Sequence, residues 1–377
     1  MGLTRRHFLG AVGAGAAATA WSLPLGPRAL AATQRGSNAG TLASPILLNS
    51  NENAYGPFPR VVTAMRDALA RANRYPDAAQ EQFVERVSKL HAVSPKQVLV
   101  GCGSVEILKM CASAFTGPSR KLIMASPTFE QIGRFAQTAG AEVVRIPLTK
   151  NFAHDLPAML AAATEAGLIY ICNPNNPTAS ITPRKDLEAF LSKVPAATHV
   201  LMDEAYHHFA IPSPEYASFL DRPAANDRVI VARTFSKVYG LAGMRLGYGV
   251  SSISAIERMR PHRLNESGNV AVLTSALTAL DDDASLHASV RRNALDRDEF
   301  ISQARARKLS AIPSQTNFAM FDTGRPVQGV IEHFKKHSVL VGRPFPPMDS
   351  YLRVSFGLPA EMERFWQVWD QQPQARG

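Results

Sequence analysis

The sequence predicts an α/β protein with a large domain built on a mostly parallel sheet and a smaller α+β domain after it. Between residues 98 and 232, short apolar runs alternate with stretches whose apolar residues recur every three or four positions. This alternation is typical of a parallel sheet covered by helices on both faces. Residues 250–310 have a largely helical pattern, and a second set of short strands and helices follows them.

The elements of the large part follow from apolar spacing. Val61, Met65 and Leu69 share one face of a helix predicted over 60–73, and Pro76 marks the break after it. A second helix is predicted over 80–90. Each later strand is predicted from an apolar run and each helix from the stretch between two runs. In order, these are strand 98–100, helix 107–115, strand 121–124, helix 129–139, strand 142–146, helix 155–165, strand 168–172, helix 183–193, strand 199–203 and strand 229–232.

The remaining elements belong to the smaller part. The helical stretch 250–310 is interrupted at Gly268 and Asn269. After it we expect strand 317–322, helix 326–337, strands 339–341 and 351–355, and helix 359–369. The predicted boundaries are 1–31 for a signal peptide, 32–74 for an N-terminal arm that also forms part of the small domain, 75–265 for the large domain and 266–377 for the small C-terminal domain.

Composition narrows the class of partner. The chain has 377 residues, a formal net charge of +10 and a hydrophobic share of 46%. Its basic residues are scattered among acids, without the aromatic-interleaved stripe or the zinc-type spacing of nucleic-acid-binding proteins. Anionic small molecules therefore fit better than nucleic acid, and no metal site is expected. The three cysteines show no paired spacing and are expected to be free thiols.

The N-terminus has the pattern of a twin-arginine signal peptide. Arg5 and Arg6 precede an Ala/Gly-rich apolar run over 10–25, and the small-x-small sequence 29–31 follows. The run is too short for a good membrane span, so no membrane association beyond export is expected. Cleavage after Ala31 would place the protein in the periplasm or outside a bacterial cell, and an unused signal would leave it in the cytoplasm.

Lys237 is the most informative single residue. It follows the apolar run 229–232, in a glycine-rich loop. A lysine there makes sense as an amine that forms a Schiff base. Thr234, Ser236 and Arg245 supply two hydroxyl groups and one bidentate cation, which a phosphate monoester needs. Together they suggest pyridoxal 5′-phosphate (PLP). The alternative for this cluster alone is a solvated lysine on an ordinary turn.

Other polar segments follow the predicted strands. Gly101 to Glu106 joins a strand to a helix start, an arrangement that binds anions, although a plain tight turn explains it as well. The segment 173–178 ends one strand and 203–206 ends the next. Carboxyl ends of parallel strands meet at one edge, so we expect these residues to meet near Lys237.

With these motifs in order, the chain resembles a fold-type I aminotransferase of class I/II, and most closely the histidinol-phosphate aminotransferase branch. The resemblance runs from residues 48–53 to 351–354. It implies the fold-type I PLP transferase architecture, a homodimer with shared active sites, and transfer of an amino group from a small-molecule donor to a 2-oxo acid. The segments that carry it are 74–77, 101–106, 175–178, 203–206, 236–237 and 243–245.

The resemblance also implies a role for each site residue. Lys237 would bind the cofactor covalently and move the proton at the substrate Cα. Asp203 would pair with the pyridine nitrogen, which makes the ring a better electron acceptor. Arg353 would bind the substrate carboxylate. The remaining implied contacts are Asn176 and Tyr206 to the phenolic oxygen, Phe129 stacked on the ring, Ser104, the Val105 backbone N–H, Thr234, Ser236 and Arg245 on the phosphate, Tyr75 on the phosphate of the neighbouring subunit, and Asn53 and Tyr55 beside the substrate entrance.

The chain also departs from this pattern. Ala179 replaces the glycine that usually follows Asn-Pro-Thr, and Val105 stands where relatives often have aspartate. Histidine biosynthesis is cytoplasmic, so the export signal favours another substrate. Two alternatives stay open: a PLP-dependent decarboxylase or lyase of the same fold, like phosphothreonine decarboxylase, and a binding module without turnover. The sequence leaves four residues open: Arg343 could line the substrate pocket and meet a distal anion or lie on the surface, His207 and His208 are structural or line the substrate site, and Cys102 fills space in the glycine loop.

Overall fold

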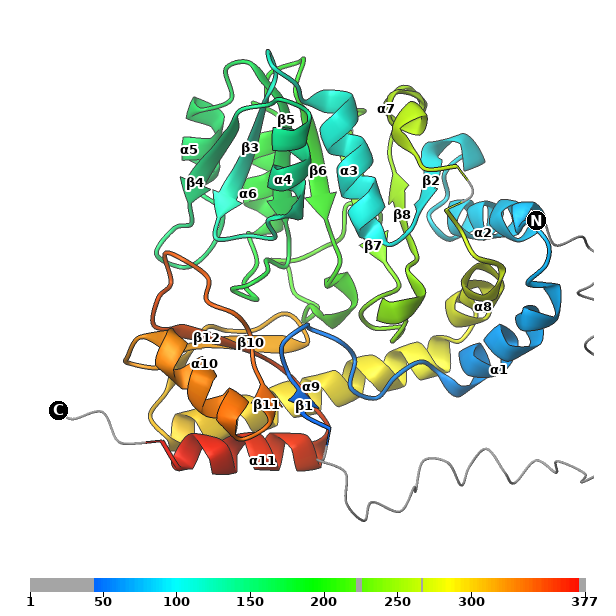
Figure 1. Ribbon diagram of the computed structural model, residues 1–377. Coiled ribbons are helices and arrows are strands. Elements are labelled where there is room, and N and C mark those ends of the chain that lie inside the picture. The colour runs from blue at the N-terminus through cyan, green and yellow to red at the C-terminus, as the bar shows by residue number, and fades with distance from the viewer. Residues whose placement is uncertain (1–43, 222–225, 266, 373–377) are drawn as a thin grey trace, which may run out of the picture. The chain divides into compact units, whose positions relative to one another are not determined.

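The computed structural model describes residues 44–221, 226–265 and 267–372. The predicted signal peptide lies outside these residues. A seven-stranded sheet in the order β2-β8-β7-β6-β5-β3-β4 organises the large part (Figure 1). All neighbouring pairs are parallel except those of β8, which runs antiparallel to both β2 and β7. The strands are β2 Val98–Gly101, β3 Lys121–Ser126, β4 Val143–Pro147, β5 Ala166–Cys172, β6 His199–Asp203, β7 Val229–Thr234 and β8 Gly247–Val250.

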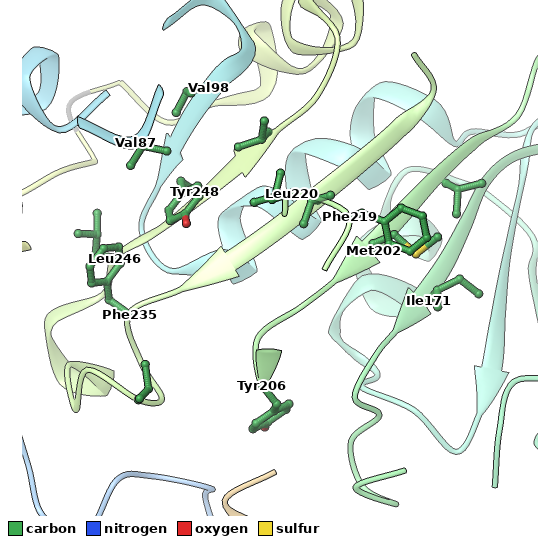
Figure 2. Packing of buried hydrophobic residues seen from close by; sticks show 14 of the residues in the cluster. Val87, Val98, Ile171, Met202, Tyr206, Phe219, Leu220, Phe235, Leu246 and Tyr248 are labelled. Carbon is green, nitrogen blue, oxygen red and sulfur yellow. The ribbon is translucent and has the colours of Figure 1, made fainter. Parts of the chain in front are cut away.

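Helices cover both faces of this sheet because alternate strand residues point to opposite sides. Ile169 and Ile171 of β5 pack in one core with helices α5 and α6, whereas Leu168 and Tyr170 pack in another with α3, α4 and α7. Figure 2 shows the first core, including Ile171 and Met202 on neighbouring strands. The helices are α1 Pro59–Ala68, α2 Asp77–Leu90, α3 Ser104–Phe115, α4 Gln131–Thr138, α5 Leu156–Ala161, α6 Arg184–Leu191, α7 Ile253–Met259 and α8 Val270–Leu280.

The C-terminal part has its own sheet and core. β10 (Phe318–Asp322) pairs antiparallel with β12 (Tyr351–Ser355) and with the short β9 (Ser310–Ala311). Near the start of the described chain, β1 (Ile46–Leu47) pairs in parallel with β11 (Val339–Leu340), and Figure 1 shows the blue strand beside the orange one. The helices of this part are α9 Asp283–Ala306, α10 Val327–Lys336 and α11 Pro359–Asp370.

The α/β fold with a large, mostly parallel sheet is confirmed. The residues from 45 onward group into one compact unit, so the boundaries predicted at residues 75 and 266 stay predictions. Two short strands were not anticipated. β8 is half glycine, and glycine weakens the apolar pattern by which a strand is recognised. β9 has only two residues.

Some helices are shorter than predicted. The helix expected over 60–73 ends at Ala68 and continues as a 3₁₀ turn over Leu69–Arg71. The helix expected over 155–165 spans only Leu156–Ala161, after an Asp155 side chain that accepts a hydrogen bond from the Ala158 N–H. Within the described residues, every helix is too short or too polar to cross a membrane.

Candidate active site

A cavity of about 700 Å³ lies at the carboxyl edge of the large sheet. Its walls include Cys172, Asp203 and Thr234, the last residues of β5, β6 and β7. Residues 49–52 and residues from the C-terminal part contribute further walls. The cavity therefore gathers positions that are far apart in the sequence. The predicted site residues that line it are Ser104, Val105, Phe129, Asn176, Asp203, Tyr206, Thr234, Ser236, Lys237, Arg245 and Arg353.

One end of the cavity has the character of a phosphate site. Helix α3 begins at Ser104, so its free backbone N–H groups and the positive end of its dipole lie there. Arg245 Nη1 donates to Ser236 Oγ at 3.3 Å. A Cβ on Gly103 would collide with Arg245 Nη2, so the guanidinium lies directly against the start of α3. No acidic side chain among the described residues pairs with Arg245.

Lys237 presents its amine to the same cavity. Its Nζ donates to the backbone oxygen of Asn51 at 2.9 Å and to that of Ser50 at 3.4 Å. Burial lowers the pKa of the amine from 10.5 to about 8, and the positive charge of Arg353 acts in the same direction. A larger fraction of the amine is therefore uncharged near neutral pH, which is the form that attacks a carbonyl carbon.

Asp203 is a buried carboxylate with two internal donors. Its side chain is 3% exposed. The Tyr170 hydroxyl donates to Oδ2 at 2.8 Å, and the Ala205 N–H donates to Oδ1 at 3.1 Å. Burial raises the pKa of Asp203 to about 6, although both hydrogen bonds act in the opposite direction. A protonated pyridine nitrogen would supply the positive partner that a buried carboxylate needs.

Arg353 reaches the cavity from β12. Its Nη1 donates to Asn176 Oδ1 at 2.7 Å and its Nη2 donates to the Asn49 backbone oxygen at 2.6 Å. Nε has no partner within the described residues, and no carboxylate pairs with this buried guanidinium there. Burial lowers its pKa to about 10. A buried cation without a counter-ion is costly, so an anionic ligand is the expected partner.

Asn51 is a site residue that the sequence reasoning missed. Its Nδ2 donates to the Tyr206 hydroxyl at 3.0 Å, and its backbone N–H donates to Ser355 Oγ at 2.8 Å. Its own backbone oxygen accepts from Lys237. It adopts a left-handed conformation with φ +54°, which asparagine tolerates better than most residues. An asparagine directly before Glu52 in the 48–53 segment was the available signal.

Three predicted residues lie elsewhere. Tyr75 is 74% exposed and does not line the cavity. Asn53 and Tyr55 line a small neighbouring pocket, where Asn53 Nδ2 donates to the Val238 backbone oxygen at 3.0 Å. The Tyr55 hydroxyl donates to Asp296 Oδ1 at 3.2 Å. Within one chain they do not join the other site residues, and their roles stay predictions.

Of the residues whose roles the sequence left open, Arg343 lines the cavity and the two histidines do not. Arg343 lines the cavity, with its guanidinium 4.3 Å from the Phe345 ring centroid. His207 and His208 lie outside the cavity lining, and burial lowers the pKa of both. Among the described residues, no group of three or more His, Cys, Asp or Glu side chains could hold a metal ion.

The cavity residues fit PLP. The start of α3 with Arg245 and Ser236 would hold the phosphate, and Asp203 would meet the pyridine nitrogen. When bound, PLP supplies a carbonyl group and an electron-accepting ring. Lys237 is placed to bind that carbonyl carbon and to move a proton at the substrate Cα. Arg353 is placed to orient the substrate through its anionic group.

Comparisons with known proteins agree with this geometry. The family model for aminotransferase class I and II matches residues 43–368. A histidinol-phosphate aminotransferase from Symbiobacterium thermophilum is 37% identical over 327 residues, which cover 85% of this chain and 88% of that protein. A solved structure assigned as a histidinol-phosphate aminotransferase, from Erwinia carotovora atroseptica, has a TM-score of 0.84 at 30% identity and covers 88% of this chain and 98% of the other.

A further solved structure carries the cofactor. The histidinol-phosphate aminotransferase from Sinorhizobium meliloti in complex with pyridoxal-5′-phosphate has a TM-score of 0.81 at 26% identity, covering 93% of this chain and 96% of that one. The relatives at 36–37% identity are aminotransferases, so they support transamination more than the decarboxylase alternative. The chain belongs to the class I and II aminotransferases, and it is a PLP-dependent enzyme whose substrates are small molecules.

Proposed function

We propose that the amino donor carries an anionic group close to its amine-bearing carbon, either a carboxylate bonded to that carbon, as in amino acids, or a phosphate ester one methylene group away, as in histidinol phosphate, and that the acceptor is a 2-oxo acid. The observation that carries this is Arg353, a buried guanidinium without a carboxylate partner among the described residues, in the same cavity as the Lys237 amine. A carboxylate or a phosphate ester would supply the missing negative charge. The relatives' name makes histidinol phosphate the first donor to test.

Arg343 supports a donor with a second polar group. Arg343 lines the cavity together with Gln328 and Phe345. These three residues come from the C-terminal part of the chain, far in the sequence from the Lys237 loop. Besides Arg245, which is expected to meet the cofactor phosphate, two guanidinium groups line the cavity, those of Arg343 and Arg353. They favour a substrate with more than one negative charge, such as a phosphate monoester or a dicarboxylate. An aromatic wall at Phe345 suits a planar side chain.

The experiment is a donor panel with spectroscopic detection. Purified protein loaded with PLP is mixed in turn with histidinol phosphate, aromatic amino acids, glutamate and aliphatic amines of similar size. Anionic donors should replace the absorbance of the bound aldehyde with that of the amine form, and a 2-oxo acid should restore it. Lys237→Ala is the control without turnover. Release of CO₂ without a keto product would favour the decarboxylase instead, and equal rates with uncharged amines would contradict the proposal.

We also propose that the protein is exported through its twin-arginine leader. Support comes from Arg5 and Arg6 before an apolar run in the sequence. Replacing both arginines with lysine should leave the protein in the cytoplasmic fraction, whereas the unchanged protein should be found in the periplasmic fraction. An unchanged distribution would contradict export. Because histidine biosynthesis is cytoplasmic, an exported enzyme is expected to prefer a donor other than histidinol phosphate.

A further inference from the structure

We propose that Tyr170 is a positioning residue, whose buried hydroxyl orients the Asp203 carboxylate toward the cavity and holds it in its charged form. Tyr170 does not line the cavity and has no part in the contacts described for the cofactor. It acts through Asp203. The inference rests on Asp203 as the partner of the pyridine nitrogen.

The sheet register places the two side chains together. β5 and β6 are parallel neighbours, and Cys172 is paired with Asp203. Tyr170 lies two residues before Cys172, so both side chains point to the same face of the sheet. The Tyr170 hydroxyl reaches Asp203 Oδ2 at 2.8 Å. This leaves the other carboxylate oxygen to the Ala205 N–H.

Burial fixes the direction of this hydrogen bond. Tyr170 is 0% exposed, and burial raises its pKa well above 10, as does the charge of Asp203. The proton therefore stays on the phenol, which donates to the carboxylate. Tyr170 in turn opposes the effect of burial, which raises the pKa of Asp203 to about 6.

A carboxylate with a pKa of about 6 is close to titration at neutral pH, so each donor affects its charge. A hydrogen bond to a charged group changes such an equilibrium by about tenfold. The Cys111 and Cys172 thiols stay protonated, because burial raises the pKa of both. The titratable groups around Asp203 are Tyr170 and Cys172 of β5, Cys111 of α3, and Tyr206 and Lys237 from the segments after β6 and β7. Glu204, whose carboxylate pairs with Arg233, acts on Asp203 through its charge.

Packing alone does not explain the hydroxyl. The Tyr170 ring is part of an apolar core with Leu168 and Leu201, where phenylalanine would fill the same space. A buried phenol needs an acceptor, and a carboxylate is a strong one. The hydroxyl therefore contributes to Asp203 more than to the core.

The test compares Tyr170→Phe with Tyr248→Phe. Tyr248 is also buried in the large sheet, and its hydroxyl contacts His91 Nε2 at 2.9 Å. Two quantities are measured: the carboxylate titration of Asp203 in the apoprotein, by isotope-edited infrared spectroscopy with Asp203→Asn as the assignment control, and the pH dependence of PLP affinity. Tyr170→Phe should raise the midpoint of both by about one pH unit, since the hydrogen bond is worth about tenfold. Tyr248→Phe should leave both unchanged.

Unchanged midpoints in Tyr170→Phe, or equal shifts in Tyr248→Phe, would overturn the proposal. Fluorotyrosine at position 170 covers the case in which Tyr170→Phe does not fold. Its more acidic hydroxyl should lower the Asp203 midpoint, and no change would count against the proposal. The apoprotein titration does not depend on turnover. If no donor of the panel reacts but the Asp203 midpoint shifts in Tyr170→Phe, the proposed substrate is wrong and the role of Tyr170 still holds.

Discussion

Individual residues in the cavity carry charges in unfavourable surroundings. Burial lowers the pKa of Lys237 and Arg353 and raises the pKa of Asp203. Each shift disfavours the charged form, so the folded chain holds groups that an anionic, ring-containing ligand would stabilise. The energetic disadvantage of the free site is thus a source of ligand affinity.

The pH dependence of cofactor uptake follows from Lys237. The uncharged amine is the reactive form, and burial lowers its pKa from 10.5 to about 8. The rate at which apoprotein takes up PLP should rise about tenfold per pH unit below pH 8 and level off above it. Stopped-flow absorbance at fixed PLP concentration measures this. A midpoint near 10.5, or a flat rate between pH 6.5 and 9, would contradict it.

Arg353 should contribute to substrate binding more than to stability. In Arg353→Lys, a point charge replaces the two-pronged guanidinium, so kcat/KM for anionic donors should fall about 100-fold through a higher KM. Steady-state kinetics measures the loss, and the melting temperature should change little. Arg86→Lys, which alters an exposed pair with Asp281, is the control and should keep full activity. Equal losses in both variants would argue against a substrate contact.

At the scale of elements, PLP binding should be sensitive to a side chain added at the start of α3. Gly103 has φ +74°, and an added Cβ would displace the Arg245 guanidinium. Gly103→Ala should therefore weaken PLP binding by about 10-fold or more, since a strained conformation adds about 1 kcal/mol to the loss of the cation. Equilibrium titration of the apoprotein measures the affinity. Gly243→Ala, where a Cβ meets nothing within 4 Å, should bind PLP normally.

A buried ion pair joins the ends of two central strands. Arg233 of β7 lies 2.9 Å from Glu204, which follows β6, and both side chains are buried. Glu204→Gln leaves the guanidinium without its counter-ion and should lower the free energy of unfolding by about 3–5 kcal/mol. Asp281→Asn removes the exposed ion pair with Arg86 and should lower the free energy of unfolding by about 1 kcal/mol or less. Urea denaturation compares the two, and similar losses would be inconsistent with a special role for the buried pair.

The sequence predicted elements well where apolar runs were long. β5, β6 and β7 were found because their residues are buried on both faces. β8 was missed because Gly247 and Gly249 leave no apolar run. The antiparallel direction of β8 depends on contacts with β2 and β7 rather than on its own residues.

At the scale of the whole molecule, the sequence indicated which residues come together but not every connection between them. Lys237, Asp203 and Arg353 follow or lie within recognisable strands, so their meeting could be foreseen. The 48–53 segment pointed to Asn51 as a candidate, but its contacts could not be foreseen, because neither its left-handed backbone nor a partner 304 residues away, Ser355, is visible in the local sequence. The role of Tyr170 could not be predicted for another reason: a tyrosine within an apolar strand has the pattern of an ordinary core residue.

A shared active site would make two defective chains complement each other. We expect a homodimer in which the exposed Tyr75 reaches the partner's phosphate site. Lys237→Ala chains should be inactive because they lack the amine, and Tyr75→Ala chains should bind PLP about 10-fold more weakly, since a charge-assisted hydrogen bond is lost. Unfolding and refolding the two together should form mixed dimers with one intact site and about half of the activity per mixed dimer. Activity no greater than that of Tyr75→Ala alone would contradict sharing.

The Asn49–Asn51 segment has a consequence for how the protein is made. Its backbone oxygens accept from both Lys237 and Arg353, and Asn51 itself is held by Ser355. During translation, the lysine leaves the ribosome more than a hundred residues before Arg353 and Ser355 do. A nascent or truncated chain that stops before residue 353 therefore lacks the supports of its own active site. We therefore expect stable loading with PLP to follow the completion of synthesis.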